Sequence, residues 1–427
     1  MRRTERAGPP NLRWPHLATK PRNPVRAALA KRIFLHALAD LPLSVVLPDG
    51  TSVGRGAGRF AEGGDPTLVI NDEDVFFTRV GRDGALGFGE AHLLGAWDCG
   101  TASAADAVAS DELVAWLKVF GEYLRPRESR VLYLLRRLWY SAHPVSDRDG
   151  VAAAVGNVQA HYDVDPRLFG AFLDESMTYS SAWFEPGDDL AAAQARKIDA
   201  ILDLADVGPG KRVLDIGSGF GGLAVRAARQ RAADVTGVTL SQKQFEHATA
   251  LVERLGLASH VRFSLEDFRR CSGTYDAIVS VEMLEAVGAA NWRTYFEVVD
   301  RLLAVDGRFA LQVITFPHRK MLVSRNDFSW VDRYVFPGGA LPSLREIDRL
   351  LDSHTSLEVT AARRLTASYA RTLREWRHRF AGQLATVTNL GFDATFCRLW
   401  VLYFAYFEAS FRSRYCDVWQ LGVRKRA

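Results

Sequence analysis

Residues 213–222 read Val-Leu-Asp-Ile-Gly-Ser-Gly-Phe-Gly-Gly, and this stretch decides the fold. The apolar run Arg212–Ile216 predicts a short strand, and Leu223–Arg229 predicts the beginning of a helix. Glycines in the turn between them let the backbone approach a ligand closely, and the start of a helix offers unpaired N–H groups. The stretch therefore predicts a strand–turn–helix unit that binds a cofactor.

An acidic residue inside the strand, Asp215, separates this turn from the dinucleotide-binding fingerprint, which does not call for an acid at that place. Its carboxylate can orient the turn, or it can bind the ammonium group at the amino-acid end of a cofactor. We therefore expect S-adenosylmethionine as the cofactor, with Gly217 and Gly219 close to it.

Further apolar stretches continue the alternation of strands and helices after this turn. They are residues 234–238, 261–265, 277–281 and 307–314, and a last strand is expected over 417–423. This order predicts an open, parallel sheet whose ligand lies at the carboxyl ends of the strands. Five residues at or just after these ends are expected to contact the cofactor: Leu240, Gln244, Leu265, Glu266 and Val281.

The length and composition favour a protein of two domains. The chain has 427 residues, 48% of them hydrophobic and 24% charged, which is ordinary for a globular protein. The four cysteines are far apart and lack CxxC spacing, so they predict neither a disulfide framework nor a zinc site. The longest apolar run, Leu399–Phe407, is too short to span a bilayer, and the first residues lack a signal-peptide core. These features predict a cytoplasmic protein.

Positive charge is concentrated at the N-terminus. Nine Lys/Arg and one Glu up to Arg32 give 9 − 1 = +8, so the remainder carries 4 − 8 = −4. We expect a basic flexible arm over residues 1–20 and then a helix with Val25, Leu29, Ile33 and Leu38 at helical spacing. Because cations lie between these residues, the helix either rests on an anionic membrane surface or packs against its own domain.

A smaller N-terminal domain of mixed strands and helices is expected over residues 21–150. Short strands are predicted at 43–47, 67–71 and 75–80, and a glycine-rich patch follows them at 84–95. Helices are predicted around 104–108 and 111–124, and a linker over 125–149. We therefore place the domain boundary near residue 150.

Several motifs follow one another in a recognisable order. They are His161-Tyr162-Asp163, Leu173-Asp174, residues 177–184, residues 279–288, Tyr295-Phe296, residues 333–339 and residues 369–373. In this order they resemble the cyclopropane-fatty-acyl-phospholipid synthase family of S-adenosylmethionine-dependent methyltransferases. Within that family, residues 312–318 and 391–393 look most like fatty-acid methyltransferases of the tuberculostearate type.

The resemblance implies an α/β protein with the class I, Rossmann-like methyltransferase fold and a mainly parallel, seven-stranded sheet. It implies a methyltransferase domain over 151–427, with a cap insertion around 316–355, beside the smaller N-terminal α+β domain. It also adds Tyr179 and Ser180 to the residues expected at the cofactor.

The resemblance further implies a reaction. A methyl group from S-adenosylmethionine adds to the cis double bond of an oleoyl-type phospholipid chain, and the resulting carbocation then loses a proton. The family holds a bicarbonate ion as the base, and the matching catalytic positions here are Ser181, Glu285, Gln312, Ile314 and Tyr369. A hydride shift before proton loss gives a 10-methylene branch; direct loss closes a cyclopropane ring, which is the alternative product.

Two of these positions depart from the family. Ser181 stands where the family usually has Cys, and Gln312 stands where it often has His, although both residues can donate a hydrogen bond to an anion. Aromatic faces stabilise a carbocation without trapping it. Candidates for that role are Tyr179, Trp183, Phe328, Trp330 and Tyr334. An aromatic stripe within 394–412 either walls an acyl channel or packs in the core.

The partners implied are the acyl chains of membrane phospholipids, with peripheral association on the inner face of the membrane. A flavin- or NADPH-dependent reductase is a further implied partner, and nucleic acid is not. Two other functions stay open: a methyltransferase for soluble small molecules, and a lipid-binding protein that has lost catalysis through Ser181 and Gln312.

Overall fold

The computed structural model describes residues 14–21, 23–39, 41–54, 66–100, 111–124, 165–324 and 327–426. The chain forms two compact units. Unit 1 comprises Met1–Ala142, Phe328–Arg333 and Asp393–Leu402; unit 2 comprises His143–Asp327, Tyr334–Phe392 and Tyr403–Ala427. Most of the predicted arm, the predicted helix at 104–108, the linker with its boundary near 150, and the His161–Asp163 motif lie outside the described residues.

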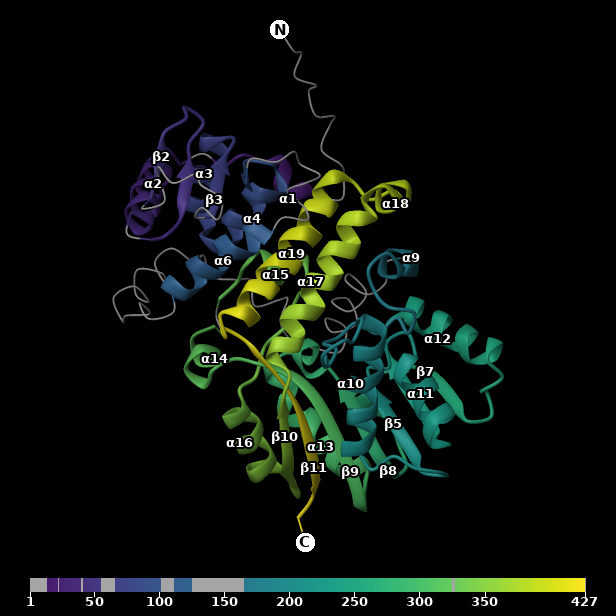
Figure 1. Cartoon of the computed structure of the whole chain (residues 1–427). Helices are drawn as coiled ribbons and strands as arrows, with labels where there is room; N and C mark the ends of the chain where they lie inside the picture. Colours follow the sequence, from purple (N-terminus) through teal and green to yellow (C-terminus); the bar gives the residue numbers. More distant parts are fainter. Residues whose placement is uncertain are drawn as a thin grey trace. The chain divides into compact units, whose positions relative to one another are not determined.

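Unit 2 is built on a seven-stranded sheet of order β10-β11-β9-β8-β5-β6-β7 (Figure 1). The strands are β5 (Arg212–Ile216), β6 (Asp234–Thr239), β7 (Val261–Leu265), β8 (Tyr275–Val281), β9 (Leu303–Thr315), β10 (Leu357–Arg364) and β11 (Asp417–Lys425). β5 to β9 pair in parallel, whereas β11 pairs antiparallel with both neighbours. The expected mainly parallel, seven-stranded sheet is confirmed, and β10 is the strand that the apolar pattern did not identify.

Helices cover both faces of this sheet. Those of unit 2 are α9 (Pro166–Gly170), α10 (Leu190–Leu204), α11 (Gly222–Arg231), α12 (Gln242–Arg254), α13 (Trp292–Leu302), α14 (His318–Ser324), α16 (Leu344–His354), α17 (Thr366–Gly382) and α18 (Leu384–Asn389), with 3-10 turns η3 (Phe268–Arg270), η4 (Leu284–Val287) and η5 (Ala289–Asn291). Alternate side chains of β5 enter two separate cores: Val213 packs with residues of α10 and α11, and Leu214 packs with residues of α13 and α16.

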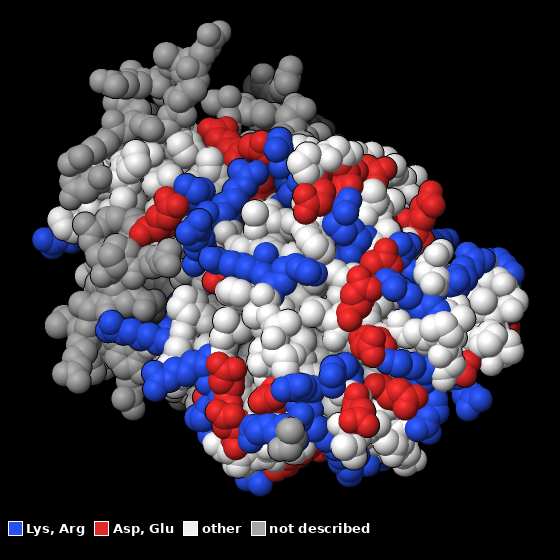
Figure 2. Space-filling view, turned by 60° about the horizontal axis from the view of Figure 1, so that its bottom comes forward, with Lys and Arg blue, Asp and Glu red and all other residues white. Residues whose placement is uncertain are grey.

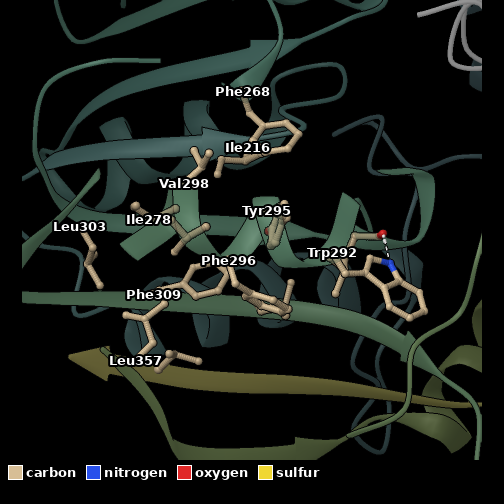
Figure 3. Packing of buried hydrophobic residues seen from close by; sticks show 14 of the residues in the cluster. Ile216, Phe268, Ile278, Trp292, Tyr295, Phe296, Val298, Leu303, Phe309 and Leu357 are labelled. Atoms are coloured by element: carbon tan, nitrogen blue, oxygen red, sulfur yellow. Dashed lines mark hydrogen bonds between the residues drawn. The ribbon is translucent and has the colours of Figure 1, made fainter. Parts of the chain in front are cut away.

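The core on the α13 side fixes the segment that follows β8. Trp292, Tyr295 and Phe296 of α13 are buried against strand residues such as Ile278 (Figure 3). The indole N–H of Trp292 donates to the Leu284 carbonyl oxygen at 3.2 Å, so α13 holds η4 directly. The chain after β8 is therefore positioned by packing and by a hydrogen bond.

Unit 1 contains a four-stranded sheet of order β2-β1-β3-β4. Its strands are β1 (Ser44–Val46), β2 (Ser52–Val53), β3 (Thr67–Ile70) and β4 (Trp97–Cys99), and its helices include α1 (Pro15–Ala18), α2 (Pro24–Leu38), α3 (Glu73–Asp83), α4 (Ala85–Leu93) and α6 (Asp111–Leu124). Two helices contain residues of both units: α15 (Trp330–Tyr334) and α19 (Ala394–Arg412) each begin in unit 1 and end in unit 2.

One prediction within unit 1 is wrong. The expected strand at 75–80 is part of α3, because the Asp72 carboxylate accepts the Val75 N–H and starts a helix. The glycine-rich patch at 84–95 contains α4, whose glycines permit close helix packing. A Cβ at Gly87 would lie 1.9 Å from the Arg79 carbonyl oxygen.

The helix predicted from residue 25 onward is α2, but its packed stripe is not the predicted one. Ala30, Phe34 and Leu38 are buried, and the Phe34 ring lies 5.2 Å from that of Phe76. Val25, Leu29 and Ile33 are instead 76%, 47% and 48% exposed. Apart from Leu38, the predicted apolar stripe therefore faces away from the domain.

The aromatic stripe of α19 contributes to the core of unit 2. Phe404 is buried, with its ring 5.2 Å from Phe172, 5.8 Å from Phe380 and 6.3 Å from Trp376. At this position core packing is the correct interpretation. Elsewhere in unit 2, the Ser343 side chain caps α16 by accepting the Glu346 N–H.

None of the helices within the described ranges has the length and apolar composition needed to cross a membrane. On the face seen in Figure 2, basic and acidic side chains lie side by side over most of the described surface.

Candidate active site

The glycine turn forms one wall of a cavity in unit 2. Gly217, Gly219 and Gly221 have φ of +82°, +54° and +90°, a region in which side chains are rarely tolerated. The N–H groups of Gly217 and Ser218 both donate to the Val238 carbonyl oxygen at 3.0 Å, which ties the turn to β6. A Cβ at Gly217 would lie 2.6 Å from the Met283 side chain. Met283 therefore fills the space beside Gly217, whereas a Cβ at Gly219, which also lines the cavity, would meet no atom within 4 Å and would project into open space.

Nine of the ten residues expected at the cofactor line this cavity. They are Tyr179, Ser180, Asp215, Gly217, Gly219, Leu240, Gln244, Glu266 and Val281. The tenth, Leu265, ends β7 with a side chain that is 43% exposed and is not among the lining residues. Ser241 caps α12 by accepting the Gln244 N–H and so fixes the start of the helix that carries Gln244.

Asp215 is buried in the wall of the cavity, and its Oδ2 atom has no hydrogen-bond partner within the described part of the chain. Burial raises the pKa of this carboxyl to about 7, and the nearby Lys197 acts in the opposite direction. An unsatisfied buried acceptor is costly, so it indicates a position at which a ligand donor is expected.

Lys197 of α10 also lines the cavity, and sequence reasoning missed it. Its side chain is 1% exposed, and its ammonium group donates to the Ser180 hydroxyl at 2.5 Å. Three residues before it, Gln194 donates to the Ser180 carbonyl oxygen at 2.9 Å. The sequence offered one signal for it. Lys197 lies at helical spacing from the apolar or uncharged residues Ala193, Gln194 and Ile201, which places a cation on the buried face of the helix.

A second polar cluster is centred on Glu282, which follows β8 and faces the same cavity. Three donors hold its carboxylate. The Ser181 N–H and the Gln312 side-chain amide both donate to Oε1 at 2.8 Å, and the Tyr369 hydroxyl donates to Oε2 at 2.6 Å. Gln420 donates to the Gln312 Oε1 atom at 3.0 Å, which turns the Gln312 nitrogen toward the carboxylate.

The electrostatics of Glu282 combine burial with these bonds. Burial raises its pKa above the ordinary value, and the hydrogen bonds from Tyr369, Gln312 and Ser181 lower it in turn. Its φ of +52° is unusual for a residue with a side chain and marks local strain. A carboxylate held under strain by three donors at the wall of a cavity is a candidate for chemistry.

Glu285 lies beside this cluster and is held differently. Its Oε1 atom accepts the Ile314 N–H at 2.5 Å, while its Oε2 atom has no partner among the described residues. Burial and, next, the charge of Glu282 raise the pKa of Glu285 to about 8. Two neighbouring buried carboxyls rarely ionise together, so Glu285 is the one that stays neutral at pH 7.

The structure thus brings the five expected catalytic residues into one region. Ser181, Gln312 and Tyr369 surround Glu282, and Glu285 bonds with Ile314 next to them. The Ser181 hydroxyl itself donates to the Ala182 carbonyl oxygen, so Ser181 reaches the carboxylate through its N–H. Glu282, the centre of the cluster, was not among the expected residues, although it directly follows a buried strand.

The expected aromatic group divides between the two units. Phe328 and Trp330 belong to unit 1, whereas Tyr179, Trp183 and Tyr334 belong to unit 2. The guanidinium of Arg363 lies 4.2 Å from the centre of the Trp183 ring, so one face of that ring is already occupied by a cation. The Tyr179 hydroxyl donates to that of Tyr403 at 2.9 Å.

Comparison with known proteins places this site in context. Residues 151–421 match the mycolic acid cyclopropane synthetase family. The chain is 41% identical over 419 residues to a tuberculostearic acid methyltransferase of Mycobacterium tuberculosis, covering 96% of this chain and 94% of that protein. It is 33% identical over 372 residues to the cyclopropane-fatty-acyl-phospholipid synthase of Escherichia coli, covering 86% and 90%.

The fold agrees with a solved relative. A mycolic acid cyclopropane synthase in complex with SAH and CTAB superposes with a TM-score of 0.58 and 31% sequence identity. The match covers 64% of this chain and 98% of that one.

Proposed function

The chain belongs to the mycolic acid cyclopropane synthetase family, and from that premise we propose a function for its cavity. The protein is an S-adenosylmethionine-dependent methyltransferase that acts on the cis double bond of an oleoyl-type phospholipid chain. Its product carries a 10-methylene branch. The tuberculostearic acid methyltransferase, which matches nearly the whole chain at 41% identity, favours this product over the ring made by the relative from Escherichia coli at 33%.

The cavity suits the cofactor on two observations: the open space beside the Gly219 backbone, and the unpartnered buried oxygen of Asp215. Gly217 and Gly219 would lie against the cofactor, and Leu240, Gln244 and Glu266 would contact its adenosine part. When bound, S-adenosylmethionine supplies an electrophilic methyl group.

We propose Glu282 as the proton acceptor of the reaction. This proposal depends on one observation: the Glu282 carboxylate faces the cofactor cavity and is held by three donors. The alkene takes up the methyl group and becomes a carbocation, a hydride moves from the methylated carbon to its neighbour, and a proton of the added methyl leaves to Glu282. The electron pair of that C–H bond forms the methylene double bond.

The bicarbonate ion implied by the resemblance would have to accept hydrogen bonds from the same donors that already bind the Glu282 carboxylate. The Ser181 N–H, the Gln312 amide and the Tyr369 hydroxyl all point at the protein's own carboxylate. These residues therefore do not fit a separate anion while Glu282 occupies the position. Proton removal by a built-in carboxylate is accordingly the proposal, and dependence of turnover on added bicarbonate would contradict it.

Glu285 has a supporting role in this proposal. A pKa of about 8 keeps it protonated at pH 7, so that only one of the two neighbouring carboxyls carries charge. Its bond to the Ile314 N–H anchors the turn after β8 to the end of β9. Glu285 is a positioning residue for Glu282.

Methyl incorporation tests the function. The protein is incubated with methyl-labelled S-adenosylmethionine and vesicles containing dioleoyl phosphatidylglycerol, and label in the lipid fraction is counted. Distearoyl vesicles, which lack the alkene, are the matched control. Label in the dioleoyl lipid alone is the expected result. No incorporation by a protein that still binds S-adenosylhomocysteine would favour the non-catalytic lipid-binding alternative. Label only in soluble acceptors would favour the alternative of a methyltransferase for soluble small molecules.

Peripheral membrane association is part of the proposal, and α2 is the surface that supports it. We define its apolar face as Val25, Leu29 and Ile33, which are 76%, 47% and 48% exposed. Arg26 and Arg32 are exposed beside it, and residues 20–38 contain no acidic residue. An exposed apolar stripe with exposed arginines beside it is complementary to an anionic lipid surface.

Vesicle cosedimentation tests this surface. Combined Val25→Ser, Leu29→Ser and Ile33→Ser should lower binding to phosphatidylglycerol-containing vesicles by about tenfold or more, because three apolar side chains no longer insert. Leu322→Ser, at a 49% exposed position on α14, is the control and should bind like the wild type. Vesicle binding by the triple variant equal to that of the wild type would contradict the assignment. So would a wild type that is dimeric in the absence of vesicles and a triple variant that is monomeric, because the apolar face would then be a contact between two copies of the chain.

The reductase partner also stays a proposal. Saturation of a 10-methylene branch needs a hydride and a proton, so a flavin- or NADPH-dependent reductase would supply the hydride and water the proton. Conversion of the isolated product to a 10-methyl chain by such a reductase is the corresponding test.

A further inference from the structure

The cavity contains one buried cation whose role in cofactor binding is not covered by the proposal above. Among the described residues that line it, the basic ones are Lys197 and Arg269. Arg269 is held by the Asp267 carboxylate at 2.6 Å and 2.8 Å. The Lys197 ammonium donates instead to a neutral hydroxyl, that of Ser180.

An ammonium group has three donors, and only a charged or strongly polar partner compensates the cost of burying it. Three carboxylates act on Lys197 at a distance: those of Glu282, Asp174 and Asp215. Asp174 accepts bonds from Ser176 through Oδ2 and is not among the residues that line the cavity, and Glu282 accepts its three donors. Lys197 is thus placed to neutralise charge and retains capacity for an anionic ligand.

The methionine end of the cofactor carries one carboxylate and one ammonium group. The cavity offers the complementary pair: a buried cation at Lys197 and an unpartnered acceptor oxygen at Asp215. We propose that Lys197, together with the Ser180 hydroxyl, forms the subsite for the cofactor carboxylate, and that Asp215 receives the ammonium group. This inference depends on the proposed cofactor, but not on the methyl acceptor or on the product.

Several features of α10 support the assignment. Asp189 caps the helix through the Ala192 N–H, and Gln194 fixes the Ser180 backbone. The helix therefore positions both the ammonium group and the hydroxyl segment that it contacts. Burial lowers the pKa of Lys197 to about 8, so the group is still mainly charged at pH 7, and an added carboxylate would raise that value.

A pair of ligands separates binding of the carboxylate from general stability of the site. S-adenosylhomocysteine is compared with 5′-(3-aminopropylthio)-5′-deoxyadenosine, which has the ammonium group but lacks the carboxylate. Dissociation constants are measured by calorimetry at pH 7 for the wild type, Lys197→Met and Ser180→Ala. Lys211→Met, at a surface lysine bonded to Asp206, is the matched control.

The wild type and Lys211→Met should prefer S-adenosylhomocysteine by about 10- to 100-fold, as expected for a charged hydrogen bond in a buried site. Lys197→Met should lose this preference, with little change or a gain in affinity for the decarboxylated ligand. Ser180→Ala, which keeps the cation, should reduce the preference by about three- to tenfold.

A preference that survives in both variants would overturn the assignment, and so would a Lys197→Met variant that binds both ligands more weakly by the same factor. In those cases Lys197 would serve only as a structural counter-ion. Absence of binding of either adenosyl ligand to the wild type would instead overturn the proposed cofactor, and with it this subsite. Normal ligand preferences without lipid methylation would leave the subsite intact and refute the proposed substrate.

Discussion

Replacement of Glu282 by Gln removes the proposed base with little change in shape. The amide can keep all three contacts if its oxygen faces the Ser181 N–H and the Gln312 amide. Its NH₂ group would then face the Tyr369 hydroxyl, which can turn to accept. Cofactor-site structure and stability should therefore survive. Loss of a general base typically costs 10²- to 10⁴-fold in rate, so turnover should fall by about that factor.

The assay measures methyl transfer to dioleoyl phosphatidylglycerol alongside S-adenosylhomocysteine affinity. That affinity should stay within about threefold of the wild type, because this ligand has no sulfonium charge to interact with Glu282. Glu285→Gln is the matched control. Its pKa of about 8 makes the wild-type side chain neutral at pH 7, so the amide should lower turnover less than about tenfold. The reasoning is refuted if Glu282→Gln retains more than a tenth of wild-type turnover.

Glu282→Gly extends the same prediction. Glycine tolerates the φ of +52° at this position and leaves the three donors without their carboxylate. Added bicarbonate or formate should then restore part of the lost activity to this variant, but not to Glu282→Gln, whose amide still fills the space. Equal rescue of both variants would show that the anion acts elsewhere.

Further predictions concern the surroundings of the carboxylate and the glycine turn. Tyr369→Phe removes a hydrogen bond that lowers the pKa of the Glu282 carboxylate. The acid limb of the pH–rate profile should therefore move to higher pH, and kcat at pH 7 should fall about tenfold. An acid limb that does not move would count against the contact between Tyr369 and Glu282. For Glu285, the folded pKa of about 8 exceeds the ordinary value of 4.5, so its contribution to stability is present below pH 4.5 and is lost as pH rises toward 8. Glu285→Gln should therefore gain stability over the wild type across that interval, by up to a few kcal/mol in denaturant unfolding, and a constant difference would contradict the assigned pKa. Gly217→Ala should weaken S-adenosylhomocysteine binding at least tenfold, because its Cβ would meet the Met283 side chain at 2.6 Å. Gly210→Ala is the control: with φ +70° and open space around its Cβ, it should lose only about 1 kcal/mol of stability. Equal effects of the two substitutions on binding would refute the role given to the close approach of Gly217 and Met283.

Much of the sheet could be predicted because its signals are local. The strand before the glycine turn and the last strand are short apolar runs with clear turn residues around them. Strand β10 was missed because every residue after Leu357 is half-buried or exposed and several are charged, so burial leaves little pattern. The residues 75–80 resembled a strand through their aromatic pair, and the cap at Asp72 decided for a helix.

The site could be predicted in its members but not in its centre. The resemblance places Ser181, Gln312 and Tyr369 around a bicarbonate ion, whereas in the structure their donors bind the Glu282 carboxylate. That depends on the direction of the Glu282 side chain, which a positive φ after β8 determines and which no periodicity reveals. Lys197 was missed for a similar reason: its contact with Ser180 joins two segments that the sequence separates.

The central claim is that the protein places a methylene branch on an acyl chain, and the position of hydrogen in the product tests it most directly. The substrate is phosphatidylglycerol whose oleoyl chains carry deuterium at both alkene carbons, and the product is analysed by mass spectrometry and deuterium NMR. A hydride shift before proton loss should leave both deuterium atoms on the single carbon next to the methylene-bearing carbon. A cyclopropane ring with one deuterium on each of the two former alkene carbons would contradict the account.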